Sequence, residues 1–403
     1  MPFKAAAEEP VSRQLRWHRA AAIGFATLFV LSAVWGYWLG RAQPRPVDFL
    51  SFWAAGRLAL HGKAALAYNL VWHRFVEQTA APIKGLLPFP YPPPFLLVVS
   101  PFALLPYWTA LAFWVIVTAI IYLAAVRKFA PLPYSLAHPA VPVNSWIGQN
   151  GFLTCGIFAL GLAALDVSPV AGGAIFGLLI IKPQLALLIP IAFVAGRQWW
   201  GIAGAASGAL LLLAIGYALF GPSSYEGFVQ ALPHQASVIA NGRVPWNELA
   251  SPFAFCRLLG IPREHSLAVQ AVVAILAGAV TWRAWWLGLN SRGPVLAAAT
   301  LLIPPYLFTY DSLLLMIPIG WLVRCHAHPV GLAIIWLLCL LPVISYSGAY
   351  TGPNTIPLAA VLCLWLLHVD EKSRKPENAL PTHPPMSARR KPALRRLDRP
   401  RYF

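Results

Sequence analysis

Apolar runs of about twenty residues recur along the whole chain, and short polar breaks separate them. A helix of about twenty apolar residues is long enough to cross the hydrocarbon core of a bilayer. Because the runs follow one another without a long polar segment between them, the pattern predicts one membrane domain. The expected fold is all-α, a polytopic integral membrane protein of about 10–12 transmembrane helices.

The composition supports a membrane protein. Of the 403 residues, 59% are hydrophobic and 11% are charged, and a surface exposed to water needs more charge than this. The chain offers no polar stretch long enough for a soluble catalytic domain. The five cysteines form no spaced pair, so we expect neither a disulfide framework nor a cysteine-based metal site.

Basic residues predict how the chain is oriented. The first apolar run, Ala20 to Gly40, exceeds a signal-peptide core and follows several arginines, which indicates a retained first span that enters from the cytoplasm. The end of the chain is rich in Lys and Arg among Pro, Ser and Asn, which is typical of a disordered tail. We expect this tail to contact membrane lipids of the inner leaflet and no nucleic acid. The expected segments are a cytoplasmic segment at 1–19, a transmembrane domain at 20–370 with external loops at 41–93 and 221–266, and a basic cytoplasmic tail at 371–403.

Two apolar intervals are too long for one comfortable span, and proline interrupts each near its middle. They are 169–196, with Lys182-Pro183 at the break, and 294–323, with Pro304-Pro305 followed by Tyr310-Asp311. Broken helices of this kind bring polar groups to a cavity. If each interval is a hairpin of short arms, Lys182 and Asp311 reach the same side of the membrane as the first external loop. The proline-rich region 130–146 leaves ten or twelve crossings open, with twelve preferred.

Few acidic residues remain once the two tails are set aside. A solvated loop or turn is enough to explain most of them: Asp166, Glu226, Glu248, Glu264 and Asp370. Asp48 differs because it opens the run from Phe49 to Leu60, which ends at Gly62. It is either a helix N-cap, with Gly62 as the C-terminal stop, or a catalytic base. The pattern alone does not separate these two interpretations.

Three more residues carry two interpretations each. Asp311 in an apolar interval is either a functional group or a polar plug bonded to a neighbouring helix. Lys182 either extends to the membrane interface or contacts a phosphate, which a desolvated ammonium binds strongly. Tyr91, within a proline-rich stretch, belongs either to a rigid membrane-entry turn or to a surface that stacks against a sugar.

At these residues the sequence resembles glycosyltransferase family 87, the polyprenyl-phosphate-mannose-dependent mannosyltransferases of the GT-C superfamily. The resemblance rests on the order and spacing of weak motifs over roughly residues 45 to 320. These are Asp48-Phe49 through Ala54-Ala55 to Gly62 and Tyr68; Tyr91-Pro92-Pro93 with Pro101 and Leu105-Pro106; Gly148-Gln149-Asn150; and Gly172 and Gly177 before Lys182-Pro183.

The resemblance implies a GT-C type fold and a transferase in the bacterial inner membrane, with both termini cytoplasmic. The donor would be a polyprenyl-phosphate hexose, with mannose as the expected sugar, and the acceptor a lipid or glycan reached from the periplasm. Neither a cofactor nor a metal is expected, because the lipid-phosphate sugar is itself a substrate. Asp48 is the predicted base and Lys182 the predicted phosphate contact, while Asp311, Tyr91 and Gln149 would orient the sugar. The family analogy also implies inversion at the anomeric carbon.

Two other classes of protein fit the same polar groups less well. A transporter or flippase for a lipid-linked glycan would use them as a translocation path, but such proteins carry internal repeats, and none is evident here. A non-catalytic scaffold would not explain charges inside proline-broken helices. The sequence therefore favours a membrane glycosyltransferase.

Overall fold

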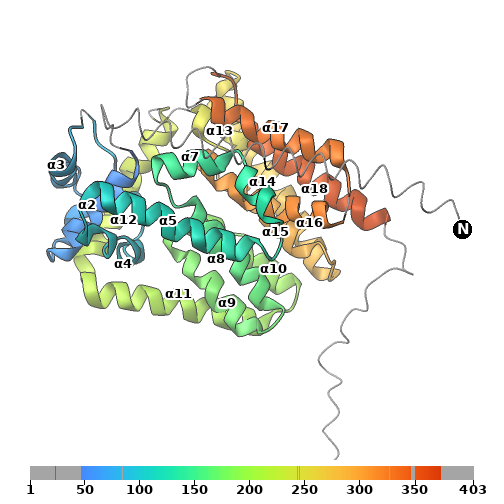
Figure 1. The fold of residues 1–403 in the computed structure, drawn as a ribbon, viewed down its shortest axis with the longest axis horizontal. Coiled ribbons are helices and arrows are strands. Elements are labelled where there is room, and N and C mark those ends of the chain that lie inside the picture. The colour runs from blue at the N-terminus through green and yellow to red at the C-terminus, as the bar shows by residue number, and fades with distance from the viewer. Residues whose placement is uncertain are drawn as a thin grey trace, which may run out of the picture.

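The structure is a computed structural model that describes residues 23, 47–83, 85–242, 244, 246–325, 327–345 and 350–373. The expected segment 1–19, nearly all of the expected first span and most of the expected basic tail lie outside these residues. Within these residues every regular secondary-structure element is a helix. The β-type pairing among them is one isolated bridge between Leu249 and Phe308. The all-α prediction is therefore confirmed (Figure 1).

The chain alternates α-helices with short 3₁₀ helices, labelled η. The first half contains α2 (Phe49–Leu60), η1 (Ala64–Tyr68), α3 (Leu70–Ala80), α4 (Pro94–Val99), η2 (Phe102–Leu104), α5 (Tyr107–Val126), α6 (Leu132–Ala137), α7 (Ala140–Ile147), α8 (Gly151–Leu165), α9 (Pro169–Gly177), η3 (Leu178–Ile181), η4 (Pro183–Ala186) and α10 (Ile189–Ala195). The second half contains α11 (Trp199–Phe220), α12 (Pro222–Ala240), η5 (Trp246–Glu248), α13 (Pro252–Leu258), α14 (Arg263–Trp286), α15 (Arg292–Thr300), η6 (Thr309–Leu315), α16 (Met316–Arg324), α17 (Pro329–Ser345) and α18 (Ile356–Ser373).

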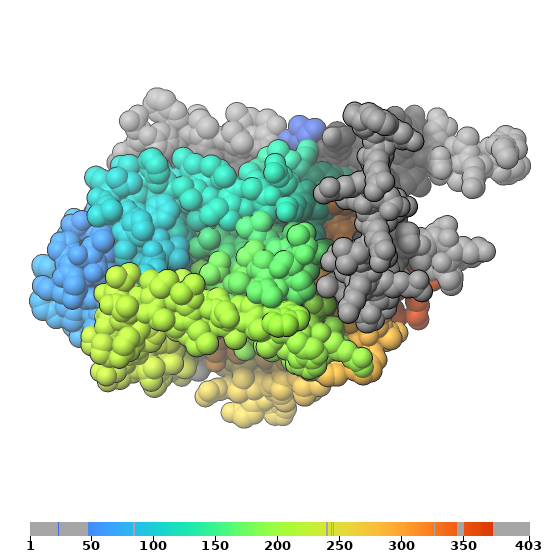
Figure 2. Space-filling view, turned by 90° about the horizontal axis from the view of Figure 1, so that it is seen from below, coloured from blue at the N-terminus to red at the C-terminus, as the bar shows by residue number. Residues whose placement is uncertain are grey.

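Three helices in the described part of the chain, α5, α11 and α14, are long and apolar enough to cross a membrane. Each of them also carries large apolar side chains that are exposed, such as Ile120, Leu219 and Ile275. Figure 2 shows α11 and α14 on one face of the molecule. Such a face suits lipid rather than water. The apolar helices α8, α9 and α17 are shorter than these three, and the number of crossings stays a prediction.

Helices α2, α3 and α12, which belong to the two expected external loops, lie together at one end of the molecule, on the left in Figure 1. Helix α12 of the second loop contacts η1 of the first. At this contact Gly227 lies beside Ala65 and Tyr68, close enough that a Cβ there would touch both. Since the two loops meet, they lie on the same side of the protein, as the topology prediction requires.

The interval around Lys182 is broken at Lys182-Pro183, where proline was expected to interrupt it, and its two parts form a hairpin. Its arms α9 and α10 lie together, because the ring centroids of Phe176 and Phe193 are 5.8 Å apart. Glycines at four-residue spacing let the backbones of α9 and α11 touch, and a Cβ at Gly177 or Gly208 would collide with the facing backbone. This close packing fixes the arm that leads to the break, where Lys182 separates two 3₁₀ helices.

The second interrupted interval also folds back on itself, since α15 and α16 pack against each other with η6 between them in the chain. The end of the chain differs from expectation. Asp370, expected in a solvated segment, is buried within α18 and accepts a hydrogen bond from Trp321 Nε1 at 3.4 Å. Helix α18 continues to Ser373 because Glu371 is tied to the bundle by Ser291, whose hydroxyl donates to Glu371 Oε2 at 2.8 Å.

Candidate functional site

Asp48 stands at the start of α2, but its carboxylate does not cap the described amides of that helix. The residue is itself helical, with φ −53° and ψ −29°, whereas a capping residue usually has an extended backbone. The N-cap interpretation is therefore wrong, although Gly62, with φ +69°, does end the helix as predicted. The backbone before Asp48 is anchored where Val47 N donates to the Tyr107 hydroxyl at 3.2 Å. This leaves the half-buried carboxylate free to meet other side chains.

The partner of Asp48 is Gln149, whose Nε2 donates to Asp48 Oδ2 at 3.0 Å. Gly148 makes this contact possible. It ends α7 with φ +67°, and a Cβ there would lie 2.6 Å from Phe49 Cβ and 2.6 Å from Leu111 Cδ1. Because glycine alone fits this conformation and this close approach, Gln149 can reach the start of α2. Burial raises the pKa of Asp48, and the hydrogen bond from Gln149 partly opposes that rise.

Tyr91 binds the oxygen of the Gln149 side-chain amide, whose nitrogen binds Asp48. Its hydroxyl donates to Gln149 Oε1 at 3.3 Å. Its ring is 6% exposed and packs in an aromatic cluster, with centroids 4.6 Å from Phe95 and 5.3 Å from Phe52. Burial raises the pKa of Tyr91, and the charges of nearby carboxylates raise it further. The hydroxyl therefore stays protonated and keeps the amide oriented toward Asp48. Stacking of this ring on a sugar stays a prediction.

Lys182 is 2% exposed and turned inward, so extension to the membrane interface is not what the structure shows. Its Nζ lies 2.5 Å from Asp311 Oδ1 and donates to Asn150 Oδ1 at 3.2 Å. It also stands 4.7 Å from the centroid of the Tyr310 ring. The second oxygen of Asp311 accepts a hydrogen bond from Phe308 N at 3.1 Å. Asp311 is thus bonded to a neighbouring helical element, one of its two predicted roles, and its contact with a sugar stays a prediction.

Two adjacent residues connect the two halves of the site. Gln149 binds Asp48, and Asn150 binds Lys182. Asn150 is fully buried, and its Nδ2 has no hydrogen-bond partner among the residues that the structure describes. A buried donor without a partner is costly, so this amide is suited to a ligand oxygen. The sequence marked the Gly-Gln-Asn element, but the separate role of Asn150 was not predicted.

Glu248 is a carboxylate that sequence reasoning placed in solvent. In the structure it ends η5, and its main-chain oxygen accepts a hydrogen bond from Thr309 Oγ1 at 3.2 Å. The bridge between Leu249 and Phe308 ties the same segment to the turn that carries Asp311. Burial, together with the nearby charge of Asp48, raises the pKa of Glu248 to about 7. No sequence signal could have found this residue, because its environment comes from a segment sixty residues later.

The other acids of the large loop and the α8–α9 turn behave as predicted. Glu226 and Glu264 are exposed. Asp166 has 78% of its side chain exposed and lies 3.8 Å from Arg292. These carboxylates need no explanation beyond solvation. The described chain thus brings Asp48 and Gln149 into one hydrogen-bonded group with Tyr91, and joins this group to Lys182 through Asn150.

This arrangement offers a carboxylate with an elevated pKa on one side and a buried cation on the other. Such a pair can accept a proton at one point and stabilise negative charge at another. It contains none of the glycine-rich loops that hold a nucleotide.

Comparison with known families gives one result. The model of glycosyltransferase family 87 matches residues 89–305, which is more than half of the 403 residues. The match includes Tyr91, Gln149 and Lys182, begins after Asp48 and ends before Asp311. Comparison with curated proteins found no match, and neither did comparison with solved structures. Because the match covers more than half of the chain, the chain belongs to glycosyltransferase family 87.

Proposed function

We propose that this glycosyltransferase moves a hexose, with mannose as the expected sugar, from a polyprenyl-phosphate donor to a lipid or glycan acceptor at the periplasmic face of the membrane. The family makes the chain a glycosyltransferase, so the transporter, flippase and scaffold alternatives are set aside. What we propose beyond this is the class of donor, the identity of the sugar and the side of the membrane on which transfer takes place. Its support comes from the residues that surround Asp48 and Lys182.

The observation that carries the proposal is the Gln149-Asn150 link. Adjacent side chains bind the carboxylate of Asp48 and the ammonium of Lys182, so base and cation face a shared region. Hexose transfer from a phosphate needs both, because one oxygen must lose a proton while another gains negative charge. A buried cation suits a phosphate whose sugar is carried by a membrane lipid better than it suits a soluble nucleotide.

The proposed reaction is a single displacement. Asp48 accepts the proton of the acceptor hydroxyl as its oxygen forms a bond to the anomeric carbon. The bond between that carbon and the phosphate oxygen breaks, and the phosphate keeps the electron pair. Lys182 has three N–H donors, of which Asp311 and Asn150 each accept one. In our proposal the third, together with Asn150 Nδ2, binds the departing phosphate. Attack opposite the leaving group inverts the anomeric carbon.

The remaining residues position these groups in our proposal. Asp311 holds the Lys182 ammonium through their buried ion pair. Gln149 and Tyr91 fix the direction of the Asp48 carboxylate. A sugar hydroxyl could replace one of their hydrogen bonds when substrate binds, which is the orienting role expected for them. A leaving phosphate needs no strong general acid, so the mechanism requires no second protonated carboxyl.

The donor class can be tested directly. The full chain would be reconstituted in proteoliposomes with a lipid extract from cells lacking the gene, and transfer of labelled hexose to lipid measured by mass spectrometry. Polyprenyl-phosphate mannose, glucose and galactose would be compared with GDP-mannose. We expect transfer from a polyprenyl-phosphate hexose and none from GDP-mannose. Transfer from the nucleotide sugar in the absence of polyprenyl phosphate would refute the proposal.

The proposed sidedness needs a separate experiment. Gln78 on α3 and Asn290 between α14 and α15 are both exposed, and the topology prediction places them on opposite sides of the membrane. Cysteines introduced at each position would be treated in intact cells with an impermeant thiol reagent, in a Cys325→Ser background. We expect labelling at position 78 and protection at position 290. The reverse pattern would place the site on the cytoplasmic side.

A further inference from the structure

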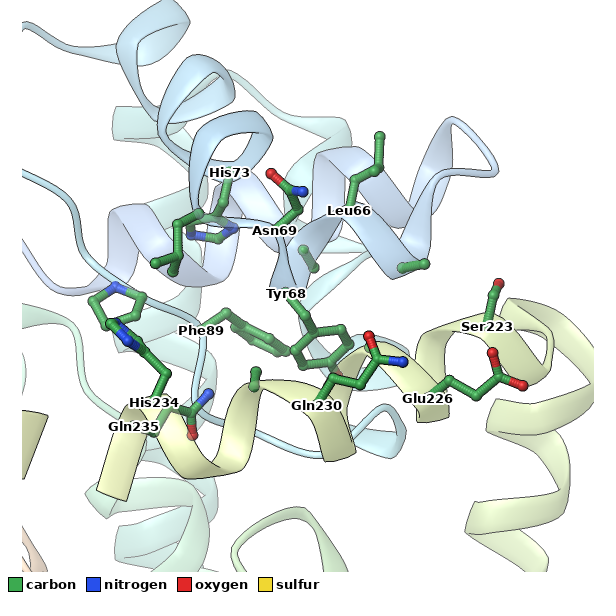
Figure 3. A pocket seen from close by; sticks show the side chains of 16 residues that line it. Leu66, Tyr68, Asn69, His73, Phe89, Ser223, Glu226, Gln230, His234 and Gln235 are labelled. Carbon is green, nitrogen blue, oxygen red and sulfur yellow. The ribbon is translucent and has the colours of Figure 1, made fainter. Parts of the chain in front are cut away.

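A groove separate from the Asp48 site opens between the two external loops (Figure 3). Its volume is about 410 Å³, within the range of roughly 300–1,000 Å³ that small-molecule sites occupy. One wall comes from η1, the start of α3 and the segment before Tyr91, and the other from α12. The described lining residues are Ala65, Leu66, Ala67, Tyr68, Asn69, Leu70, His73, Pro88, Phe89, Ser223, Glu226, Gly227, Gln230, Ala231, His234 and Gln235.

The floor of the groove is aromatic and buried. Tyr68 and Phe89 lie with ring centroids 5.8 Å apart. His73 lies beside them, 6.5 Å from Phe89 by ring centroids, and is 1% exposed. Neither ring nitrogen of His73 has a hydrogen-bond partner among the described residues, although Glu77 Oε1 lies 3.5 Å from Nε2. Nε2 is therefore paired with the Glu77 carboxylate, while Nδ1 is a buried polar atom without a partner among the described residues, which indicates a ligand that can form hydrogen bonds.

The rim is polar and exposed. Figure 3 shows Gln230 extending from α12 beside Tyr68, while His234 on the same helix extends to the other side of Phe89. Amide side chains both donate and accept hydrogen bonds, as the hydroxyl groups of a sugar do. Among the described lining residues none is lysine or arginine, so the groove lacks the cations that bind phosphate. The rim also carries the exposed carboxylate of Glu226 and the imidazole of His234, which can likewise bind hydroxyl groups. Aromatic rings below and amide, imidazole and carboxylate groups above fit an uncharged polyol with apolar C–H faces, which is a saccharide.

Tyr68 connects the groove to the proposed reaction site through hydrogen bonds. The Tyr68 hydroxyl donates to the main-chain oxygen of Tyr91 at 2.9 Å, and Tyr91 in turn binds Gln149. Tyr68 is therefore both a floor residue of the groove and a support for the side chain that orients the Asp48 partner. A ligand in the groove would therefore contact a residue that supports the site without replacing the reacting groups.

We propose that this groove binds a neutral saccharide unit of the acceptor, at a position away from the hydroxyl that receives the hexose. The inference rests on the proposed function and specifies its acceptor as a molecule that already carries sugar. The donor lipid does not need such a site, because in the proposed function its phosphate binds at Lys182 and its single hexose lies near Asp48. Glycan contacts at the groove would hold the acceptor while its terminal hydroxyl approaches Asp48.

Binding can be measured without catalysis. The full chain carrying Asp48→Asn would be placed in phospholipid nanodiscs, which contain no sugar detergent, and studied by saturation-transfer difference NMR. The probes are the methyl α-glycosides of mannose, glucose and galactose, with maltose and cellobiose. We expect at least one probe to receive saturation, and Gln230→Ala with His234→Ala to abolish it. A matched variant, Gln78→Ala with His265→Ala, removes exposed side chains of the same types outside the groove and should keep the signal.

Two results would overturn the inference. One is the absence of saturation transfer to every probe, and the other is a signal that survives in the Gln230→Ala/His234→Ala variant. Because Asp48→Asn is used, this outcome does not depend on whether the chain transfers hexose. In the active protein the same pair of substitutions should raise the KM for the acceptor about tenfold and leave the KM for the donor unchanged. A larger effect on donor KM than on acceptor KM would also contradict it.

Discussion

The ammonium of Lys182 lies 2.5 Å from Oδ1 of Asp311, and the two side chains are 2% and 0% exposed. Each comes from the break in a proline-interrupted hairpin, and the breaks are far apart in the sequence. A buried pair of this kind is costly to desolvate and is not by itself a source of stability. Removing one partner, however, leaves an uncompensated charge. The pair therefore makes the fold depend on both hairpins being correctly placed.

Lys182→Ala should lower the free energy of unfolding by about 3–5 kcal/mol, because the Asp311 carboxylate is left buried without its cation. Asp311→Ala should have a similar effect, and the double variant should lose less than the sum of the two. The measurement is denaturant or thermal unfolding of purified protein in detergent. The control is Arg292→Ala, which breaks an exposed pair with Asp166 and should cost less than about 1 kcal/mol. Additive single effects would show that the pair is not coupled.

The Lys182→Ala/Asp311→Ala variant also tests the phosphate contact, since it removes the cation without leaving an unpaired acid. If Lys182 holds the donor phosphate, kcat/KM for the donor should fall about tenfold to a hundredfold, the effect of losing a charge-assisted hydrogen bond. Transfer kinetics at varied donor and saturating acceptor would measure it. Wild-type donor kinetics in folded protein would remove Lys182 from the site.

Local pattern predicted the hairpins and the end of α2 because both depend on neighbouring residues. Proline interrupts a helix wherever it occurs, and Gly62 ends one by its own backbone conformation. The positions of Asp48 and Glu248 could not be predicted in the same way. Whether a carboxylate caps a helix depends on a rotation of its side chain, which here is fixed by Gln149. Burial of Glu248 depends on the turn at Phe308, which only the folded chain brings near.

The Asp48→Asn variant tests whether Asp48 acts as the general base or has only a structural role. The amide keeps an oxygen that can accept the hydrogen bond from Gln149, so the fold should be retained. It cannot accept a proton, and losing a general base typically lowers the rate by about 10²–10⁴-fold. Purified variants matched in thermal stability would be assayed for hexose transfer, with Asp166→Asn as an exposed control. Near-normal activity of Asp48→Asn would move the base to Glu248 or another acid.

Gly148→Ala should damage both fold and site. Its φ of +67° is strained for alanine, and the added Cβ would lie 2.6 Å from Phe49 Cβ. Strain and overpacking together should cost about 2–5 kcal/mol and displace Gln149 from Asp48. Gly288→Ala is the matched control, because φ there is +62° and no atom lies near the added Cβ. It should cost only the backbone strain, about 1–2 kcal/mol. Equal unfolding temperatures for the two variants would contradict the close approach at Gly148.

Glu248 predicts a specific dependence of stability on pH. Burial and the charge of Asp48 raise its pKa from an ordinary 4.5 to about 7. Between these values the folded state keeps a proton that the unfolded state has released, so stability falls as pH rises through this window. Glu248→Gln has no proton to lose, and its unfolding temperature should therefore fall less than that of the wild type between pH 4.5 and 7. Above this window, the plots of unfolding temperature against pH for Glu248→Gln and for the wild type should run parallel. Glu264→Gln, an exposed control, should follow the wild type throughout. Identical profiles for Glu248→Gln and the wild type would show that Glu248 titrates as a solvated carboxylate.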